Sequence, residues 1–190
     1  MNVKVPLPAD ADLPADVVAV LQGLPPLNVF RMMANAPASF HGWAAVALSI
    51  LLQSEFDPRK REIAILRVAH VTRAPYEWTQ HLRLARSLGV SEAEIQAIAV
   101  AGAVTGLDPE GNLLCRVADE ISRDVRLSDE ALAAILERYG VRQATELIVC
   151  ISYFNMLSRF LESTRVELEA EDLIGGRTPA EMAAHAPRKG

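Results

Sequence analysis

The segment from Arg61 to His81 constrains the fold of this chain more than any other part of the sequence. Its pattern predicts two helical stretches joined by a turn at residues 71–75, with Pro75 at the start of the second stretch. Its side chains are largely apolar, but four of them can exchange protons: Glu62, His70, Glu77 and His81. A chain that folds around this segment must bury acids and imidazoles together in a helical hairpin.

The spacing of these residues predicts that three of them meet. Glu77 and His81 are four positions apart, which on an α-helix is a rotation of about 400° and a rise of roughly 6 Å, so both side chains lie on one face. If residues 71–75 connect antiparallel helices, Leu66 lies opposite His81, and Glu62 lies about one turn beyond and can approach His81. A carboxylate on one imidazole nitrogen fixes the tautomer and leaves the other nitrogen for a substrate. The pattern therefore predicts an acid–base site.

Prolines, glycines and capping residues predict that the rest of the chain is helical as well. Asp57 before Pro58 is typical of a helix start, and Ser91 with Glu94 has the pattern of a capping box. No stretch alternates in the way that a strand does. We expect an all-α, single-domain helical bundle with the hairpin 58–72 and 75–88 at its centre. The expected helices span residues 14–22, 28–35, 37–53, 58–72, 75–88, 92–100, 109–125, 129–140 and 142–171.

Chain length and the positions of helix-breaking residues predict the domain organisation. The chain has 190 residues, which suits one domain with a core of its own. Prolines near the start predict that residues 1–13 form an extended N-terminal arm. We expect the helical domain to cover residues 14–172 and residues 173–190 to form a mobile C-terminal tail.

Charge and hydropathy exclude several classes of partner. The net charge is −5 and no basic stripe stands out, which argues against nucleic-acid binding. The longest largely apolar run, residues 42–52, is far shorter than the ~20 residues of a membrane span. Asp10, Asp12 and Asp16 lie where a signal peptide would have its apolar core. We expect a soluble protein of the cytoplasm that binds neither membranes nor nucleic acid.

The two cysteines, Cys115 and Cys150, belong to separate predicted helices, with no Cys-x-x-Cys motif and no histidine at a metal-ligand spacing. We expect both to be buried structural residues. The Glu-x-x-x-His spacing of Glu77 and His81 also differs from the Glu-x-x-His of di-iron bundles. The sequence thus predicts neither a metal nor a cofactor.

The stretch REIAILRVAHVTRAPYEWTQHLRLARSLGVSEAEI resembles the core of the carboxymuconolactone decarboxylase family, whose superfamily includes alkyl hydroperoxidase D. A looser likeness extends from about Asn28 to Glu167. The resemblance implies the helical bundle of the alkyl hydroperoxidase D-like type. It also implies a homo-oligomer, which we expect to be a dimer, trimer or hexamer. Apolar helices at 37–53 and 146–161 agree with this, and the N-terminal arm is placed to lie across a neighbouring subunit.

The peroxidase branch of this superfamily has a Glu, eleven residues, Cys-x-x-Cys, three residues and a His. Glu62 and His81 match the first and last of these at the same spacing, but the two cysteine positions hold Ala74 and Glu77. These side chains cannot form a dithiol, which argues against peroxidase chemistry by the family's route. The cofactor-free decarboxylase branch keeps a Glu-x-x-x-His motif, which Glu77 and His81 satisfy. This chain is thus similar to a branch without the cysteines.

The resemblance implies a lyase of the kind met in aromatic degradation, acting on a small carboxylated lactone or a related keto or enol acid. The catalytic residues expected from it and from the spacing are His81, Glu77 and Glu62. The expected substrate-binding residues are Tyr76, Trp78 and His70. The alternative is a peroxidase-like or a non-catalytic small-molecule-binding member of the superfamily that lacks the dithiol.

Plainer interpretations of the same residues stay open. Glu77 and His81 also suit an ordinary surface pair on a helix, and Glu62 also suits a carboxylate that offsets a helix dipole. His70 fits a hydrogen-bonded turn histidine, and the neighbouring aromatic side chains fit packing roles.

Other polar side chains have less specific patterns. A stripe on the last long helix is either a solvated or subunit-facing edge or a pocket wall in which the arginine meets a substrate carboxylate. The stripe consists of Ser152, Asn155 and Arg159. Three arginines of the central segment are expected to face solvent: Arg61, Arg67 and Arg73.

Overall fold

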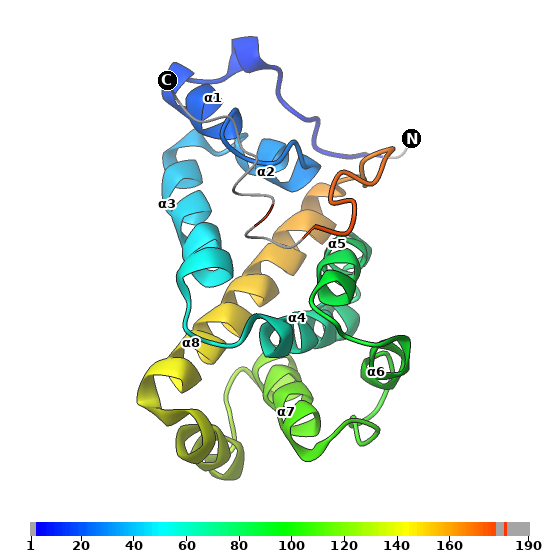
Figure 1. Cartoon of the computed structure of the whole chain (residues 1–190). Coiled ribbons are helices and arrows are strands. Elements are labelled where there is room, and N and C mark those ends of the chain that lie inside the picture. Colours follow the sequence, from blue (N-terminus) through cyan, green and yellow to red (C-terminus); the bar gives the residue numbers. More distant parts are fainter. Residues whose placement is uncertain (1–2, 178–180, 182–190) are drawn as a thin grey trace.

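The computed structural model of the chain describes residues 3–177 and 181. Every regular element in these residues is helical, and none of them belongs to a strand, so the predicted all-α class is confirmed (Figure 1). The elements are η1 (Asp10–Asp12), α1 (Ala15–Leu21), α2 (Asn28–Met33), α3 (Pro37–Leu48), η2 (Ser49–Gln53), α4 (Pro58–Thr72), α5 (Pro75–Ser87), α6 (Glu92–Ile98), α7 (Pro109–Asp124) and α8 (Asp129–Thr164).

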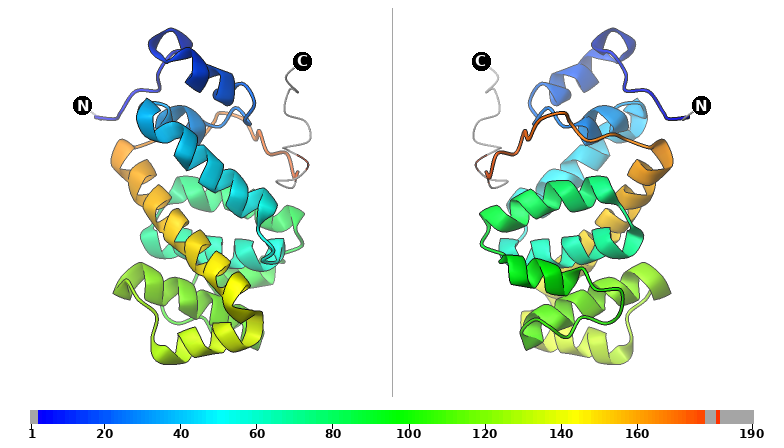
Figure 2. Two further views of the ribbon diagram at one scale, coloured as in Figure 1. Left: turned by 90° about the vertical axis from the view of Figure 1, so that its left-hand side faces the viewer. Right: turned by 90° about the vertical axis from the view of Figure 1, so that its right-hand side faces the viewer.

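Helix α4 lies at the centre of the molecule and packs against α5, α7 and α8 (Figure 1). All residues from Arg61 to Ala69 are buried, so no face of the helix is left to solvent over more than two turns. The two side views place α2 and α3 at one end of the molecule, and α7 and the first half of α8 at the other (Figure 2). The predicted hairpin of α4 and α5 therefore holds the two ends together.

Local signals explain where the central helices begin and end. The Asp57 carboxylate accepts a hydrogen bond from the Lys60 backbone N–H at 2.9 Å, and Pro58 occupies the first turn of α4. The helix ends at Arg73, whose left-handed φ of 56° stops it before Pro75 starts α5. The hairpin lies where the sequence predicted it because the residues that start and end its helices are next to those helices in the sequence.

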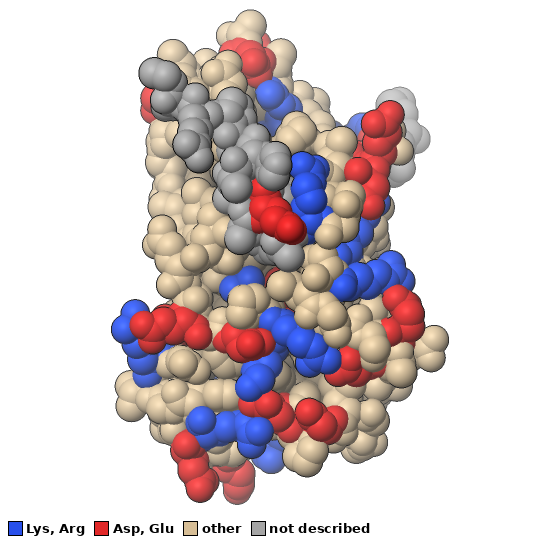
Figure 3. Space-filling model, viewed as in Figure 1, with Lys and Arg blue, Asp and Glu red and all other residues tan. Residues whose placement is uncertain are grey.

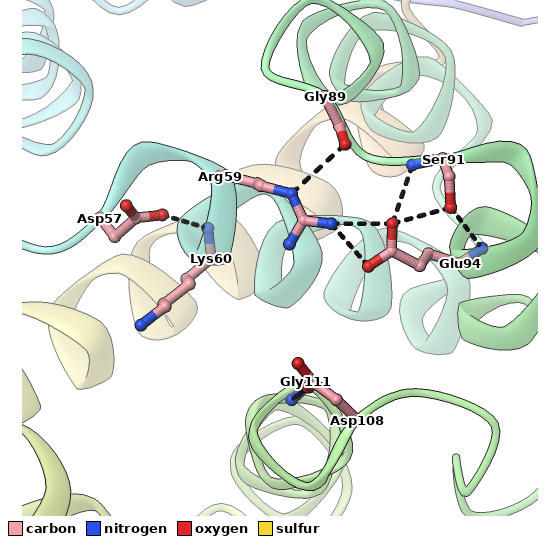
Figure 4. A network of polar contacts seen from close by, with 8 residues as sticks. All are labelled: Asp57, Arg59, Lys60, Gly89, Ser91, Glu94, Asp108 and Gly111. Atoms are coloured by element: carbon pink, nitrogen blue, oxygen red, sulfur yellow. Dashed lines mark hydrogen bonds and ion pairs between the residues drawn. The ribbon is translucent and has the colours of Figure 1, made fainter.

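The start of α4 is also fixed to α6 (Figure 4). The Arg59 guanidinium donates to both carboxylate oxygens of Glu94, at 2.6 and 2.8 Å, and to the Gly89 carbonyl at 3.3 Å. The same carboxylate accepts from the Ser91 backbone N–H at 2.9 Å and completes the predicted capping box. One carboxylate thus caps α6 and holds it against α4.

Helix α8 agrees with the prediction at its middle and differs from it at its end. The chain runs through Gly140 with φ 70° and ψ 171°, which is not helical, so two helices meet at a kink where the predicted helices 129–140 and 142–171 are divided. The helix ends at Thr164 instead of residue 171, because Arg165 is left-handed with φ 58° and turns the chain back toward α5. A left-handed helix end at an arginine, in place of the usual glycine, could not be foreseen from the sequence pattern.

The prediction that Arg61 and Arg67 face solvent is wrong, whereas Arg73 is exposed as expected. The Arg67 side chain is fully buried and bonds to both Asp119 oxygens, at 2.7 and 2.8 Å. It also donates to three backbone carbonyls between α6 and α7, those of Ile98, Val100 and Gly102. All five N–H donors of the Arg67 guanidinium thus have an oxygen acceptor, which offsets the cost of burying its charge.

The N-terminal arm lies across its own chain. The Val5 backbone N–H donates to the Thr164 carbonyl at 3.1 Å, and the Asn35 side chain donates to the Pro6 carbonyl at 3.0 Å. The arm is extended as predicted up to the short turn η1. Its expected contact with a neighbouring subunit stays a prediction.

The expected mobile tail falls largely outside the described residues, since residues 178–180 and 182–190 are not among them. Within the described part, Ile174 is 1% exposed and packs into the body of the molecule. No helix in the described residues is long and apolar enough to cross a membrane. On the face in Figure 3, Lys and Arg are interspersed with Asp and Glu, and no basic patch stands out.

Replacing Arg67 with methionine should destabilise the fold by about 3–5 kcal/mol, the usual cost of breaking a buried ion pair. The variant leaves Asp119 and three carbonyls without their donor. Urea unfolding measures the change. The matched control is Arg73→Met, which removes an exposed guanidinium and should cost less than about 0.5 kcal/mol. Equal losses in the two variants would contradict a special role for Arg67.

Candidate functional site

An apolar cavity of about 290 Å³ lies among α2, α3, η2, α5 and α8. Its wall is mostly aliphatic and aromatic, and it includes Ile174 from the segment after α8. Its polar or ionisable lining residues are few: Trp43, Tyr76, Glu77, Gln80, His81 and Tyr153. Apolar walls with a few converging polar groups are typical of small-molecule sites.

The three residues predicted to be catalytic lie together at this cavity. His81 Nδ1 is 2.7 Å from a carboxylate oxygen of Glu62, and His81 Nε2 is 3.5 Å from a carboxylate oxygen of Glu77. Glu77 and His81 line the cavity, while Glu62 is fully buried behind His81. The imidazole thus has an acid near each of its nitrogens.

The hairpin geometry creates this arrangement. Glu62 comes from the second turn of α4, and the antiparallel α5 brings His81 opposite it. The four-residue spacing places Glu77 on the same face of α5. On the α8 side, the Phe154 ring meets the His81 ring edge to face, with centroids 4.7 Å apart, so the imidazole is fixed from a third helix.

Several polar atoms of the site have no hydrogen-bond partner in the part of the chain that the structure describes. They include Glu62 Oε1, Glu77 Oε2 and Arg61 Nε. Arg61 Nε is 3.7 Å from Glu62 Oε1, and the same guanidinium donates to the Ile50 carbonyl at 3.0 Å. Buried carboxylate oxygens usually have a hydrogen-bond donor, so these oxygens have unused capacity to accept a hydrogen bond from a ligand.

Burial alone would lower the pKa of His81, because it disfavours the imidazolium. The charge of Glu62, its hydrogen bond and the charge of Glu77 act in the opposite direction, and the net result is a raised pKa. His81 is therefore set up to carry a proton near neutral pH.

Burial raises the pKa of Glu77 to about 7, against the attraction of His81 and with a further increase from the negative charge of Glu62. A carboxyl group with this pKa gains and loses its proton near neutrality. Glu77 and His81 therefore form a pair that can hand a proton in either direction.

The predicted substrate-binding residues divide into two groups. Tyr76 lies in the cavity wall, where its hydroxyl donates to Glu169 at 2.6 Å and accepts from the Val29 backbone N–H at 3.1 Å. Trp78 and His70 are not among the residues that line the cavity; their rings lie 6.0 Å apart. Trp78 follows Glu77 by one residue, which turns it about 100° away from the face of α5 that carries Glu77 and His81.

Three polar or ionisable lining residues were missed by the sequence analysis: Trp43, Gln80 and Tyr153. Trp43 and Tyr153 stack with ring centroids 6.3 Å apart, and neither Trp43 Nε1 nor the Tyr153 hydroxyl has a hydrogen-bond partner among the described residues. Tyr153 follows Ser152 directly, so the cavity-facing side of α8 is next to the polar stripe singled out in the sequence. Asn155 and Arg159 of that stripe bond to each other at 2.7 Å and do not line the cavity.

Neither cysteine is in an environment that favours thiol chemistry. Burial raises the pKa of the Cys115 thiol to about 12 and raises that of Cys150 as well, so neither forms a thiolate readily. Ala74, at one of the two dithiol positions, is a buried residue at the start of α5. Among the described residues, no cluster of three His, Cys, Asp or Glu side chains is arranged to hold a metal ion.

Residues 37–120 match the sequence model of the carboxymuconolactone decarboxylase family. This central segment belongs to that family. The match spans the α4–α5 hairpin with Glu62, Glu77 and His81, and it confirms the resemblance found in the sequence. A search of curated proteins found no match.

Two solved structures share the fold. One is an alkylhydroperoxidase AhpD core structure, an uncharacterized peroxidase-related protein from Ralstonia eutropha JMP134, with a TM-score of 0.77 and 17% identity; the match covers 93% of this chain and 97% of that one. The other is an uncharacterized peroxidase-related protein from Silicibacter sp. TM1040, with a TM-score of 0.74 and 17% identity over 92% and 95% of the two chains. At this identity the likeness establishes the AhpD-like fold and not the reaction.

The raised pKa values predict that the fold loses stability as pH rises. A folded-state pKa above the unfolded one means that Glu77 stabilises the fold fully below about 4.5, and that this contribution is lost as pH rises through about 7. The raised pKa of His81 acts in the same direction above 6.5. The Glu77→Gln side chain is neutral at every pH. As the pH rises from 5 to 8, the free energy of unfolding of this variant should therefore increase relative to that of the wild type by up to roughly 3 kcal/mol.

Urea unfolding of both proteins at four pH values measures this gain. Glu167→Gln, at an exposed carboxylate outside the cavity, is the control and should follow the wild type. A stability difference between Glu77→Gln and the wild type that does not change with pH would refute the assignment.

Proposed function

We propose that this chain is a cofactor-free lyase of the carboxymuconolactone decarboxylase type. In this proposal His81 and Glu77 perform acid–base chemistry on a small carboxylated lactone or a related keto or enol acid. The observation that carries it is the His81 imidazole, which lies between two buried carboxylates at the wall of an apolar cavity. Family membership of the hairpin supports the same class of chemistry.

The cavity wall favours loss of a carboxylate. None of the described residues that line it is a lysine or an arginine, so the His81 imidazolium is the one cation among them and most of the wall desolvates a bound carboxylate without pairing its charge. Release of neutral CO₂ removes this unfavourable charge. A volume of about 290 Å³ limits the substrate to a small molecule.

The reaction balances with the groups present. The bond between the substrate carbon and its carboxylate breaks, CO₂ leaves, and the electron pair moves onto the neighbouring carbonyl as an enolate. His81, held at Nδ1 by Glu62, gives a proton from Nε2 to the carbon as the carbonyl forms again. Glu77, close to Nε2, returns a proton taken up from bulk solvent, which restores the imidazolium, so one proton is consumed for each CO₂ released.

A thiol peroxidase is the less favoured candidate, although the two similar structures are of proteins described as peroxidase-related. Ala74 and Glu77 stand at the dithiol positions, and the two cysteines of the chain are buried. A non-catalytic binding member of the family is the other alternative. A measurement of turnover distinguishes such a binding protein from an enzyme.

Replacing His81 with alanine should abolish CO₂ release from a panel of small lactone and keto acids. Glu77→Gln and Glu62→Gln should slow it by about 10²–10⁴-fold, the range typical of general acid–base groups. Circular dichroism checks that each variant folds. The control is His41→Ala, because His41 is exposed and bonds only to Asp16 among the described contacts of its ring nitrogens. Turnover that persists in His81→Ala would exclude this mechanism.

We also propose a homo-oligomer that buries the outer face of α3 and η2. The chain has no Asp, Glu, Lys or Arg between Arg31 and Glu55, and the edge of the molecule formed by α3 shows few charges in Figure 3. Large apolar side chains are exposed on this segment and on the second half of α8: Val46, Leu52, Val149 and Met156. Apolar patches of this kind are typical of protein interfaces.

Light scattering at micromolar concentration should give a mass at least twice that of the 20.7 kDa chain. Val46→Glu should shift the protein toward the monomer, because it places a charge in the proposed interface. A wild-type protein that is monomeric under these conditions would contradict the proposal.

A further inference from the structure

The segment after α8, Arg165–Arg177, runs alongside α5 and contains no helix (Figure 2). This stretch, here called the cover segment, lies outside the family match at residues 37–120. It nevertheless supplies one residue of the cavity wall, Ile174.

Glu169 holds the first half of the cover segment. Its carboxylate accepts hydrogen bonds from the Tyr76 hydroxyl at 2.6 Å, from the Gln80 side-chain amide and from the Asn28 backbone N–H. Tyr76 and Gln80 belong to α5 and Asn28 starts α2, so one carboxylate joins the cover segment to both sides of the cavity. Three donors on one half-buried carboxylate make a specific but openable contact.

The second half is held by the same face of α5. Asp172 forms an ion pair with Arg83 at 3.3 Å, and the Arg177 carbonyl accepts from the Ser87 hydroxyl at 3.4 Å. With Tyr76 and Gln80, these α5 positions follow the spacing i, i+4, i+7 and i+11 of one helix stripe. This stripe runs beside the face that carries Glu77 and His81.

Ile174 is the point where the cover segment enters the wall. The Asp172 carboxylate accepts from the backbone N–H groups of Ile174 and Gly175, each at 3.0 Å. Gly175 and Gly176 have φ values of 58° and 73°, which let the chain turn directly after Ile174. This turn leaves the Ile174 side chain 1% exposed in a segment that is otherwise largely exposed or half-buried.

We propose that the cover segment is the removable wall of the cavity. Glu169 is the positioning residue that keeps it closed, and Ile174 sets the size of the ligand that fits. A segment held by a few polar contacts and one fully buried side chain opens at a small fraction of the cost of unfolding. The inference depends on the cavity and not on the reaction, so a failure of the proposed lyase activity leaves it intact.

Trp43 in the cavity wall reports on opening. In a Trp78→Phe background it is the only tryptophan, and acrylamide quenching measures its access to solvent. Glu169→Ala should raise the quenching constant by at least about twofold, because the closed population falls. The matched control is Glu167→Ala, at an exposed carboxylate of the same segment that pairs with Lys4.

Hydrogen exchange distinguishes opening from general destabilisation. Glu169→Ala should speed exchange in residues 166–177 and leave α4 protected, and Glu169→Gln should have the same effect in weaker form. Faster exchange in α4 as well, unchanged quenching, or equal quenching in Glu167→Ala would overturn the role of Glu169. If Glu169→Ala does not fold, the glutamine variant is held to the same criteria.

Ligand size tests Ile174 without any turnover. Cyclic ketones from cyclopentanone to cyclooctanone are titrated against Trp43 fluorescence. Ile174→Ala should shift the preference toward larger rings by about fourfold for each methylene newly accommodated. Leu168→Ala, at a 41% exposed residue of the same segment that does not line the cavity, should leave the order unchanged. An unchanged order in Ile174→Ala, the same shift in Leu168→Ala, or no binding of any ring to the parent protein would refute the size limit.

Discussion

The complete burial of α4 is the constraint on which the rest of the structure depends. A helix with no solvent-facing side over nine residues must still accommodate Arg61, Glu62 and Arg67. Each charge needs a partner in the core, and each partner fixes a neighbouring element. Arg67 requires Asp119 of α7 and the carbonyls between α6 and α7, Glu62 requires His81 of α5, and Arg61 takes the Ile50 carbonyl of η2. The charged residues buried on α4 therefore determine both how the neighbouring helices pack and where the candidate site lies.

The elements that could be predicted from the sequence are those specified by their own residues. Asp57, Pro58 and Pro75 delimit the hairpin locally, and antiparallel geometry then brings Glu62 to His81. The buried arginines could not be foreseen, because only distant carbonyls and Asp119 make a core guanidinium acceptable. The cavity wall depends on tertiary packing in the same way: Trp78 turns aside, while Tyr153, next to a polar stripe, faces inward.

The hairpin keeps the glutamate and the histidine of the superfamily pattern at their spacing, while residues between them differ. In the superfamily pattern that the sequence resembles, two thiols lie between the glutamate and the histidine. In this chain the same stretch carries Ala74 and a buried Glu77 with a pKa near 7. An acid with this pKa exchanges protons where a dithiol would exchange electrons. A structural likeness at 17% identity that extends over nearly the whole chain shows that the fold is shared.

The limits of the family match divide the cavity into two halves. The proton-transferring groups and the α3 side of the wall lie within residues 37–120, whereas Tyr153, Phe154 and Ile174 come from outside it. The Glu62–His81 pair and much of the cavity wall are thus encoded in separate stretches of the chain. Substitutions at Tyr153 or Ile174 can change the shape of the cavity without touching this pair, whereas Phe154 contacts the His81 ring. If the proposed acid–base chemistry holds, the ligand that fits can therefore diverge while the reacting pair stays the same.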